Sequence, residues 1–175
     1  MPRFKDDSLR LKSWDYANEG WYFLTLVCMD REPLFGEIEA GQIALNAFGR
    51  IVEQQWLRSA ELRPSIRLGE YVVMPDHFHA LVEIRLSRGD RQDCGDRQLS
   101  VPTGQSMPHR SPRSISSLVA GFKATCTREI NRLRTIDGGR VWQSDYHDRL
   151  VRDEAEFQRI TEYIKLNPTR WRTDP

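Results

Sequence analysis

The chain has 175 residues, of which 39% are hydrophobic and 29% are charged. This length predicts one domain over residues 1–175, because compact domains hold roughly 100–200 residues. No apolar stretch approaches the ~20 residues that a helix needs to cross a bilayer, which excludes an integral membrane protein. Lys and Arg number 26 against 25 Asp and Glu. This balance excludes a globally basic nucleic-acid binder but leaves room for a local basic patch.

The first half of the chain predicts two strands with a helix between them. Residues 21–29 are rich in aromatic and β-branched side chains, as in a buried strand. Apolar residues recur at helical spacing over residues 41–62, which predicts a long amphipathic helix that ends before Pro64. Residues 66–74 are then expected to form the second strand.

The next part of the chain predicts a third strand, a loop and a second helix. Residues 77–85 alternate between apolar and polar positions, as in a half-buried strand. Residues 86–113 are polar, charged and interrupted by Gly and Pro, and we expect a mobile loop there. Residues 115–133 carry an apolar stripe at helical spacing, and residues 141–151 predict a short strand or an extended arm.

The C-terminal part predicts a last helix that begins after Asp153, a favourable N-cap, and ends at Pro168. The predicted order of elements is therefore β, α, β, β, α, β, α. This order is typical of an α+β, ferredoxin-like fold, in which two helices cover one face of a four-stranded antiparallel sheet. The last helix would be an addition at the C-terminal end.

The cysteines and the N-terminus indicate a reducing compartment. Cys28, Cys94 and Cys126 form no CxxC pair, which argues against a disulfide framework and against a cysteine-type zinc site. The first residues are charged and show no apolar run with a cleavage site, so secretion by a cleaved signal peptide is not expected. The expected location is the cytoplasm.

The third predicted strand carries a candidate metal site. His77 and His79 are separated by one residue, so both imidazoles lie on the same face of the strand, roughly 7 Å apart along it. Two rings at this spacing can lean toward one divalent ion. Two surface histidines, or one in the core and one in solvent, would give the same short pattern, and this interpretation stays open.

The last predicted helix adds a candidate nucleophile and a third ligand. Tyr163 and Asn167 are four residues apart and share a helix face. An Asn carbonyl can bind Mg²⁺ or Mn²⁺, and a phenol beside the ion could attack a phosphate. The alternative is a half-buried tyrosine and an asparagine near the helix end. Tyr146 is a second candidate nucleophile, but its i+4 residue, Leu150, cannot bind a metal.

A local basic stretch is the candidate nucleic-acid surface. Residues 109–152 contain nine Lys and Arg residues against four Asp and Glu, and such a surface binds phosphates with strong salt dependence. The residues of this stretch that we expect at DNA are Lys123, Arg128, Arg149 and Arg152. For any single one of them, a solvated helix face is the simpler interpretation.

Two segments together carry a family resemblance. MPDHFHALVEI (residues 74–84), followed by YIKLNP (residues 163–168), resembles the REP-associated tyrosine transposases, which are HUH single-tyrosine nucleases. The resemblance spans residues 21–171 and includes VWQSDYHDRLVRDE (residues 141–154). The His-Phe-His pattern alone is weak, whereas its combination with VVMPDH (residues 72–77) before it and YIKLNP after it is specific.

The resemblance implies a role for each matching residue. His77, His79 and Asn167 would hold a divalent ion, Mg²⁺ or Mn²⁺. Tyr163 would form a transient 5′-phosphotyrosine with single-stranded DNA. The implied partner is hairpin DNA with REP-like palindromes, bound by a monomer or a homodimer in the nucleoid of the cytoplasm. Two other functions stay open: a metal-dependent phosphoester hydrolase that uses bound water, with Asp76 or Glu83 nearby, and a non-catalytic module that binds DNA hairpins.

Overall fold

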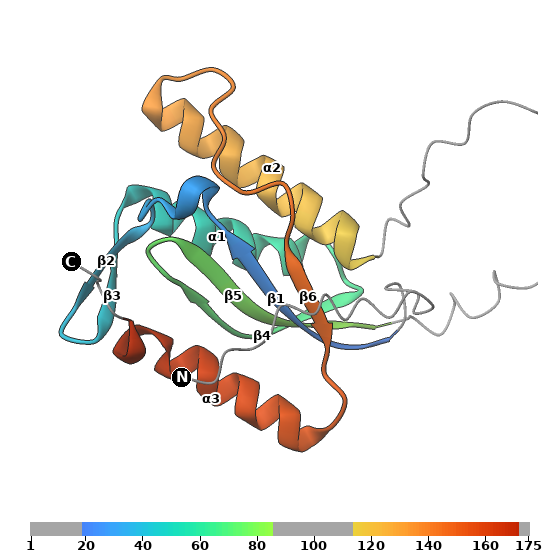
Figure 1. Cartoon of the computed structure of the whole chain (residues 1–175). Helices are drawn as coiled ribbons and strands as arrows, with labels where there is room; N and C mark the ends of the chain where they lie inside the picture. The colour runs from blue at the N-terminus through green and yellow to red at the C-terminus, as the bar shows by residue number, and fades with distance from the viewer. Residues whose placement is uncertain (1–18, 86–113, 172–175) are drawn as a thin grey trace, which may run out of the picture.

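The computed structural model describes residues 19–85 and 114–171 (Figure 1). The predicted mobile loop at residues 86–113 lies outside the described residues. In chain order the elements are β1 (Gly20–Val27), the 3-10 turn η1 (Met29–Arg31), β2 (Gly36–Glu39), β3 (Gln42–Leu45), α1 (Ala47–Glu61), β4 (Ile66–Val73), β5 (His77–Ile84), α2 (Ile115–Arg134), β6 (His147–Leu150) and α3 (Glu154–Arg170). Within this described part, no helix is both long and apolar enough to cross a membrane.

The main sheet has four antiparallel strands in the order β4-β5-β1-β6. Figure 1 shows α1 and α2 on one side of this sheet and α3 on the other. Two helices on one face of a sheet in this order form the predicted ferredoxin-like α+β arrangement, so the predicted fold class is confirmed. The added C-terminal helix covers the face that the other two leave open.

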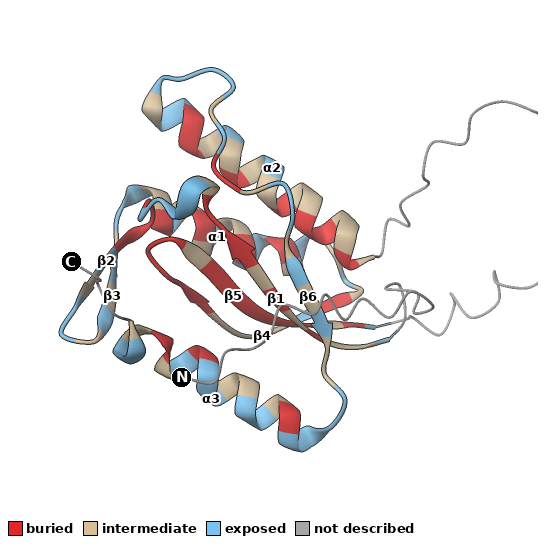
Figure 2. Cartoon of the chain, viewed as in Figure 1, coloured by how far each residue is buried: buried red, intermediate tan, exposed pale blue. Residues whose placement is uncertain are grey.

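The larger core lies between the sheet and the pair α1 and α2. Its centre is aromatic: the ring of Trp56 lies 5.1 Å from that of Phe78 and 5.4 Å from that of Phe122. Edge-to-face contacts of this kind add to the free energy gained by burying apolar area. Figure 2 shows the buried positions of α1 and α2 on their sides that face the strands.

A smaller core holds α3 against the opposite face. Leu81 of β5 and Ile164 of α3 are both fully buried in it, and Phe157 packs edge-on against Trp21 with ring centroids 4.8 Å apart. The alternation predicted for β5 is therefore correct, because Phe78 belongs to the larger core and Leu81 to the smaller one. His77 and His79 share the face of Leu81, which is the face covered by α3.

The helix predicted over residues 41–62 begins too early. The structure has the hairpin of β2 and β3 before α1, with Ala40 and Gly41 at positive φ in its turn. Asn46 then caps α1, since its side chain accepts hydrogen bonds from the backbone N–H groups of Phe48 and Gly49. Short apolar runs fit both the helical and the strand period, so the residues before Asn46 were assigned to the wrong element.

The segment of residues 141–151, predicted to be a short strand or extended, contains one isolated bridge, from Trp142 to Cys28, and the short edge strand β6. Asp153 caps α3 as predicted, accepting a hydrogen bond from the backbone N–H of Glu156 at 2.7 Å. The predicted end of this helix at Pro168 is wrong, because α3 continues to Arg170. A proline in the last turn removes only one hydrogen bond of the helix, and the helix tolerates that loss.

Candidate active site

The histidine pair lies beneath α3 on the central strand β5. The ring centroids of His77 and His79 are 4.6 Å apart. His79 is only 5% exposed, and burial, followed by the neighbouring His77, lowers the pKa of His79 to about 3. The His79 ring is therefore neutral at physiological pH, which is the state that binds a metal ion.

Each ring of the pair is held through its Nδ1 atom. Nδ1 of His77 lies 2.5 Å from a carboxylate oxygen of Asp76, and Nδ1 of His79 lies 2.9 Å from the hydroxyl of Thr25. A carboxylate can only accept, so His77 carries its proton on Nδ1 and donates it to Asp76. These contacts use the Nδ1 atoms and leave each Nε2 as the atom available to a ligand or substrate.

The helix α3 places Tyr163 and Trp171 over the two rings. The phenol oxygen of Tyr163 lies 3.4 Å from Nε2 of His79, and the ring of Trp171 lies 5.7 Å from that of His77. Tyr163 is 37% exposed, so its hydroxyl can be reached from outside the chain. A polar group that is both accessible and next to an imidazole is in a position to react with a bound substrate.

Asn167 lies between these two residues on the helix. Asn167 is buried and lies four positions after Tyr163 in α3, so these two residues share a helix face. Among the described residues, no cluster of three or more His, Cys, Asp or Glu side chains could hold a metal ion. Asn167 is the amide side chain available on this helix face. Two imidazoles suit a divalent transition ion, and an amide oxygen suits Mn²⁺ or Mg²⁺.

The second candidate nucleophile lies in the other core. Tyr146 packs against the cluster between the sheet and the pair α1 and α2, where its hydroxyl lies 2.9 Å from that of Ser116. The side chain of Lys123 lies over its ring, with Nζ 5.6 Å from the ring centroid. The structure thus brings Tyr163, and not Tyr146, to the histidine pair.

The residues predicted to contact DNA fall into two groups. On α2, Lys123 donates to three backbone carbonyls, and burial lowers the pKa of its ammonium, while Arg128 is exposed beside Glu129. Around the N-terminus of α3, Arg149 forms an ion pair with Glu156, and Arg152 is exposed. Their contact with DNA stays a prediction.

Three residues around the histidines carry contacts that the sequence analysis did not assign. Asp76 was considered only as a ligand or base of an alternative hydrolase, although its place beside His77 in the sequence was a usable signal. Thr25 reaches His79 only through the pairing of β1 with β5, in which the two residues are partners. The place of Trp171 beside His77 depends on how α3 ends, which the sequence pattern does not show.

Comparisons with known proteins concern the family and the fold of this chain. The chain is 35% identical over 167 residues to an uncharacterized protein of Haemophilus influenzae, covering 95% of this chain and 90% of that protein, and it belongs to the same family. No known protein-family profile matches the chain. Its fold is that of a solved REP-associated tyrosine transposase bound to a REP hairpin, with a TM-score of 0.56 and 16% identity over 90% of this chain and 71% of the other. A putative transposase of Deinococcus radiodurans aligns with a TM-score of 0.44 and 17% identity, over 87% and 93% of the two chains.

Proposed function

We propose that this chain is a single-stranded DNA endonuclease and transposase that cleaves and rejoins hairpin DNA through Tyr163. The observation that carries the proposal is the 3.4 Å approach of the Tyr163 phenol to Nε2 of His79. That approach combines an accessible nucleophile with a pair of oriented imidazoles. The shared fold with a transposase that was solved with a REP hairpin supports the same conclusion.

In the proposed reaction the phenol oxygen of Tyr163 attacks the phosphorus of a DNA phosphodiester. A bond forms from that oxygen to the 5′-phosphate, and the bond from phosphorus to the 3′ oxygen breaks. The phenol proton leaves to solvent, which the partial exposure of Tyr163 permits, and the 3′ oxygen takes up a proton to become a hydroxyl. The reverse attack by a 3′-hydroxyl rejoins the strand, so no nucleoside triphosphate is needed.

The other residues of the site would bind and orient. His77, His79 and Asn167 would hold a divalent ion, Mg²⁺ or Mn²⁺, which when bound supplies positive charge to a non-bridging phosphate oxygen. Asp76 and Thr25 hold the two imidazoles in the orientation that leaves Nε2 free. The proposed substrate is hairpin DNA with REP-like palindromes in the nucleoid, bound by one copy of the chain or by two.

The test is the formation of a covalent protein–DNA adduct, detected on a denaturing gel. Hairpin single-stranded DNA is incubated with Mg²⁺ or Mn²⁺, or with EDTA, using the unmodified chain, Tyr163→Phe and, as the matched control, Tyr146→Phe. An adduct that needs the metal, survives Tyr146→Phe and disappears in Tyr163→Phe is the expected result. Cleavage without an adduct would favour the hydrolase that uses water, and an adduct that Tyr163→Phe still forms would overturn the assigned nucleophile.

A further inference from the structure

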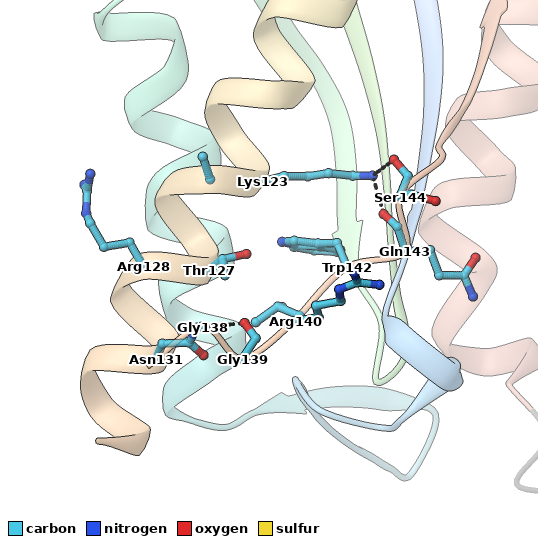
Figure 3. A pocket seen from close by; sticks show the side chains of 12 residues that line it. Lys123, Thr127, Arg128, Asn131, Gly138, Gly139, Arg140, Trp142, Gln143 and Ser144 are labelled. Carbon is cyan, nitrogen blue, oxygen red and sulfur yellow. Dashed lines mark hydrogen bonds between the residues drawn. The ribbon is translucent and has the colours of Figure 1, made fainter. Parts of the chain in front are cut away.

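A groove lies between α2 and the segment of residues 138–144, which we name the arm (Figure 3). Its volume is about 490 Å³. The described residues that line it include the basic side chains of Lys123, Arg128 and Arg140 and no Asp or Glu. A groove with this one-sided charge favours an anionic occupant.

Lys123 forms a wall of the groove. Its ammonium donates to the backbone carbonyls of Gln143 and Asp145, each at 2.8 Å, and lies 3.4 Å from that of Ser144. These contacts fix the arm to α2 and use the charge of Lys123 within the chain. The guanidinium groups of Arg128 and Arg140 are exposed at the groove, so they are the cations that an occupant would meet; Nε of Arg128 also lies 3.4 Å from a carboxylate oxygen of Glu129, with which an occupant would compete.

The groove is also lined by polar atoms that have no partner within the described part of the chain. Trp142 is 6% exposed and Asn131 is 9% exposed, and neither Nε1 of Trp142 nor Oδ1 of Asn131 has a hydrogen bond. The amide nitrogen of Asn131 is used, because it donates to the carbonyl of Gly139 at 2.7 Å. Figure 3 shows the indole lying across the groove with its nitrogen directed toward α2. An unused buried donor and acceptor are unfavourable unless a ligand satisfies them.

The arm is close in the sheet to the histidine pair. The backbone N–H of Gln143 donates to the carbonyl of Val27 at 2.9 Å, and Val27 is the partner of His77 in the pairing of β1 with β5. Two strand spacings of about 4.8 Å thus separate the arm from the strand of His77, which is about 10 Å. The groove lies on the α2 side of the sheet and the histidine pair on the α3 side, so a strand that occupies both would pass around the edge of the sheet beside β1.

We propose that this groove binds an unpaired segment of the single-stranded DNA substrate, with Arg128 and Arg140 on its phosphates and the indole N–H of Trp142 on a base. The inference rests on the proposed function and adds to it where the substrate lies. A phosphate supplies the anion that the guanidinium groups require. Every base carries an acceptor that an indole N–H can reach, so the contact needs no particular sequence.

The test measures the binding of a fluorescent single-stranded oligothymidylate by anisotropy, in EDTA and in the Tyr163→Phe background, so that no cleavage occurs. The groove variant is Arg128→Ala with Arg140→Ala. The matched control, Arg58→Ala with Arg132→Ala, removes two exposed charges from α1 and α2 outside the groove. We expect the groove variant to bind roughly tenfold more weakly and its salt slope to fall by about 1.4, because each lost contact with a single-stranded phosphate changes that slope by about 0.7.

The base contact has its own test. Trp142→Phe keeps an aromatic ring next to Phe35 and Phe122 and removes the N–H. We expect it to weaken oligothymidylate binding by roughly threefold, and to leave unchanged the binding of an abasic oligonucleotide of the same length. An equal effect on both probes would overturn the base contact.

The outcomes separate the groove from the proposed function. Equal losses in the groove variant and in the control, or no loss in either, would overturn the groove even if Tyr163 forms the expected adduct. Groove-dependent binding without an adduct at any hairpin would leave the groove standing and would contradict the proposed nuclease. The two conclusions therefore fail under different observations.

Discussion

The phenol oxygen of Tyr163 lies 3.4 Å from Nε2 of His79, although 84 residues separate them in the chain. The contact exists because α3 packs on the face of the sheet that α1 and α2 do not cover. Ile164, next to Tyr163, is fully buried there. A single chain thus supplies both the proposed nucleophile and the proposed ligand. The position of Tyr163 depends on the packing of α3, and the orientation of His79 depends on residues of β1.

Replacing Asp76 with Asn is expected to weaken Mn²⁺ binding. The carboxylate accepts a short hydrogen bond from Nδ1 of His77, and an amide at the same place lacks its charge. The loss of such a partner typically lowers metal affinity by about 10–100-fold. Isothermal titration calorimetry with Mn²⁺ measures this affinity. The matched control is Glu83→Gln, which changes a carboxylate on β5, the strand of His77, that pairs with Arg85. Equal affinities of the two variants would show that Asp76 does not position His77.

Replacing Thr25 with Val is expected to leave the buried Nδ1 of His79 without its partner. The two side chains have nearly the same shape, so the change removes only the hydroxyl that lies 2.9 Å from the ring. An unpaired buried polar atom costs about 1–3 kcal/mol of unfolding free energy. Urea denaturation measures this loss, and Mn²⁺ titration is expected to show weaker binding. Thr25→Ser should restore both quantities, and failure of this rescue would indicate that the methyl group, rather than the hydroxyl, matters.

Replacing Arg149 with Met is expected to destabilise the attachment of α3. The carboxylate of Glu156 is only 5% exposed and would keep just the backbone N–H of Arg152, at 2.8 Å. Breaking a fully buried ion pair costs about 3–5 kcal/mol. Arg149 is half exposed, so we expect about 2 kcal/mol. Urea denaturation tests this, with Arg152→Met as the control, since that change keeps the backbone contact. If the two variants were equally stable, the ion pair of Arg149 with Glu156 would not contribute to the attachment of α3.

The parts of this molecule that the sequence predicts are those with a local signal. Alternation in β5 places both histidines on one face, and the four-residue spacing of Tyr163 and Asn167 places them together on a helix. Thr25 has no such signal, because its contact with His79 depends on the register between two strands that are distant in the sequence. The hairpin of β2 and β3 was missed because four residues are too few to show a period.

Replacing Gly49 with Ala is expected to destabilise the chain, although the residue lies inside α1, where alanine is the better helix former by about 1 kcal/mol. A Cβ atom at this position would lie 2.1 Å from the backbone oxygen of Phe35. That oxygen accepts the hydrogen bond from the backbone N–H of Asn46, the N-cap of α1, so the helix cannot move away without disturbing its own start. Overpacking against fixed backbone costs about 1–3 kcal/mol or more, and we expect a net loss of about 2 kcal/mol in urea denaturation.

The matched control for this change is Gly121→Ala in α2. Its Cβ would meet only the end of the Arg63 side chain, at 3.1 Å, and a long flexible side chain can move aside. Arg63 also donates to the carbonyl of Ser117 at 3.2 Å, so its adjustment costs at most part of one hydrogen bond. The helix propensity of alanine should then prevail, giving a change between zero and about 1 kcal/mol of added stability. If both variants were stabilised, the close approach of α1 to Phe35 would not be a constraint on the fold.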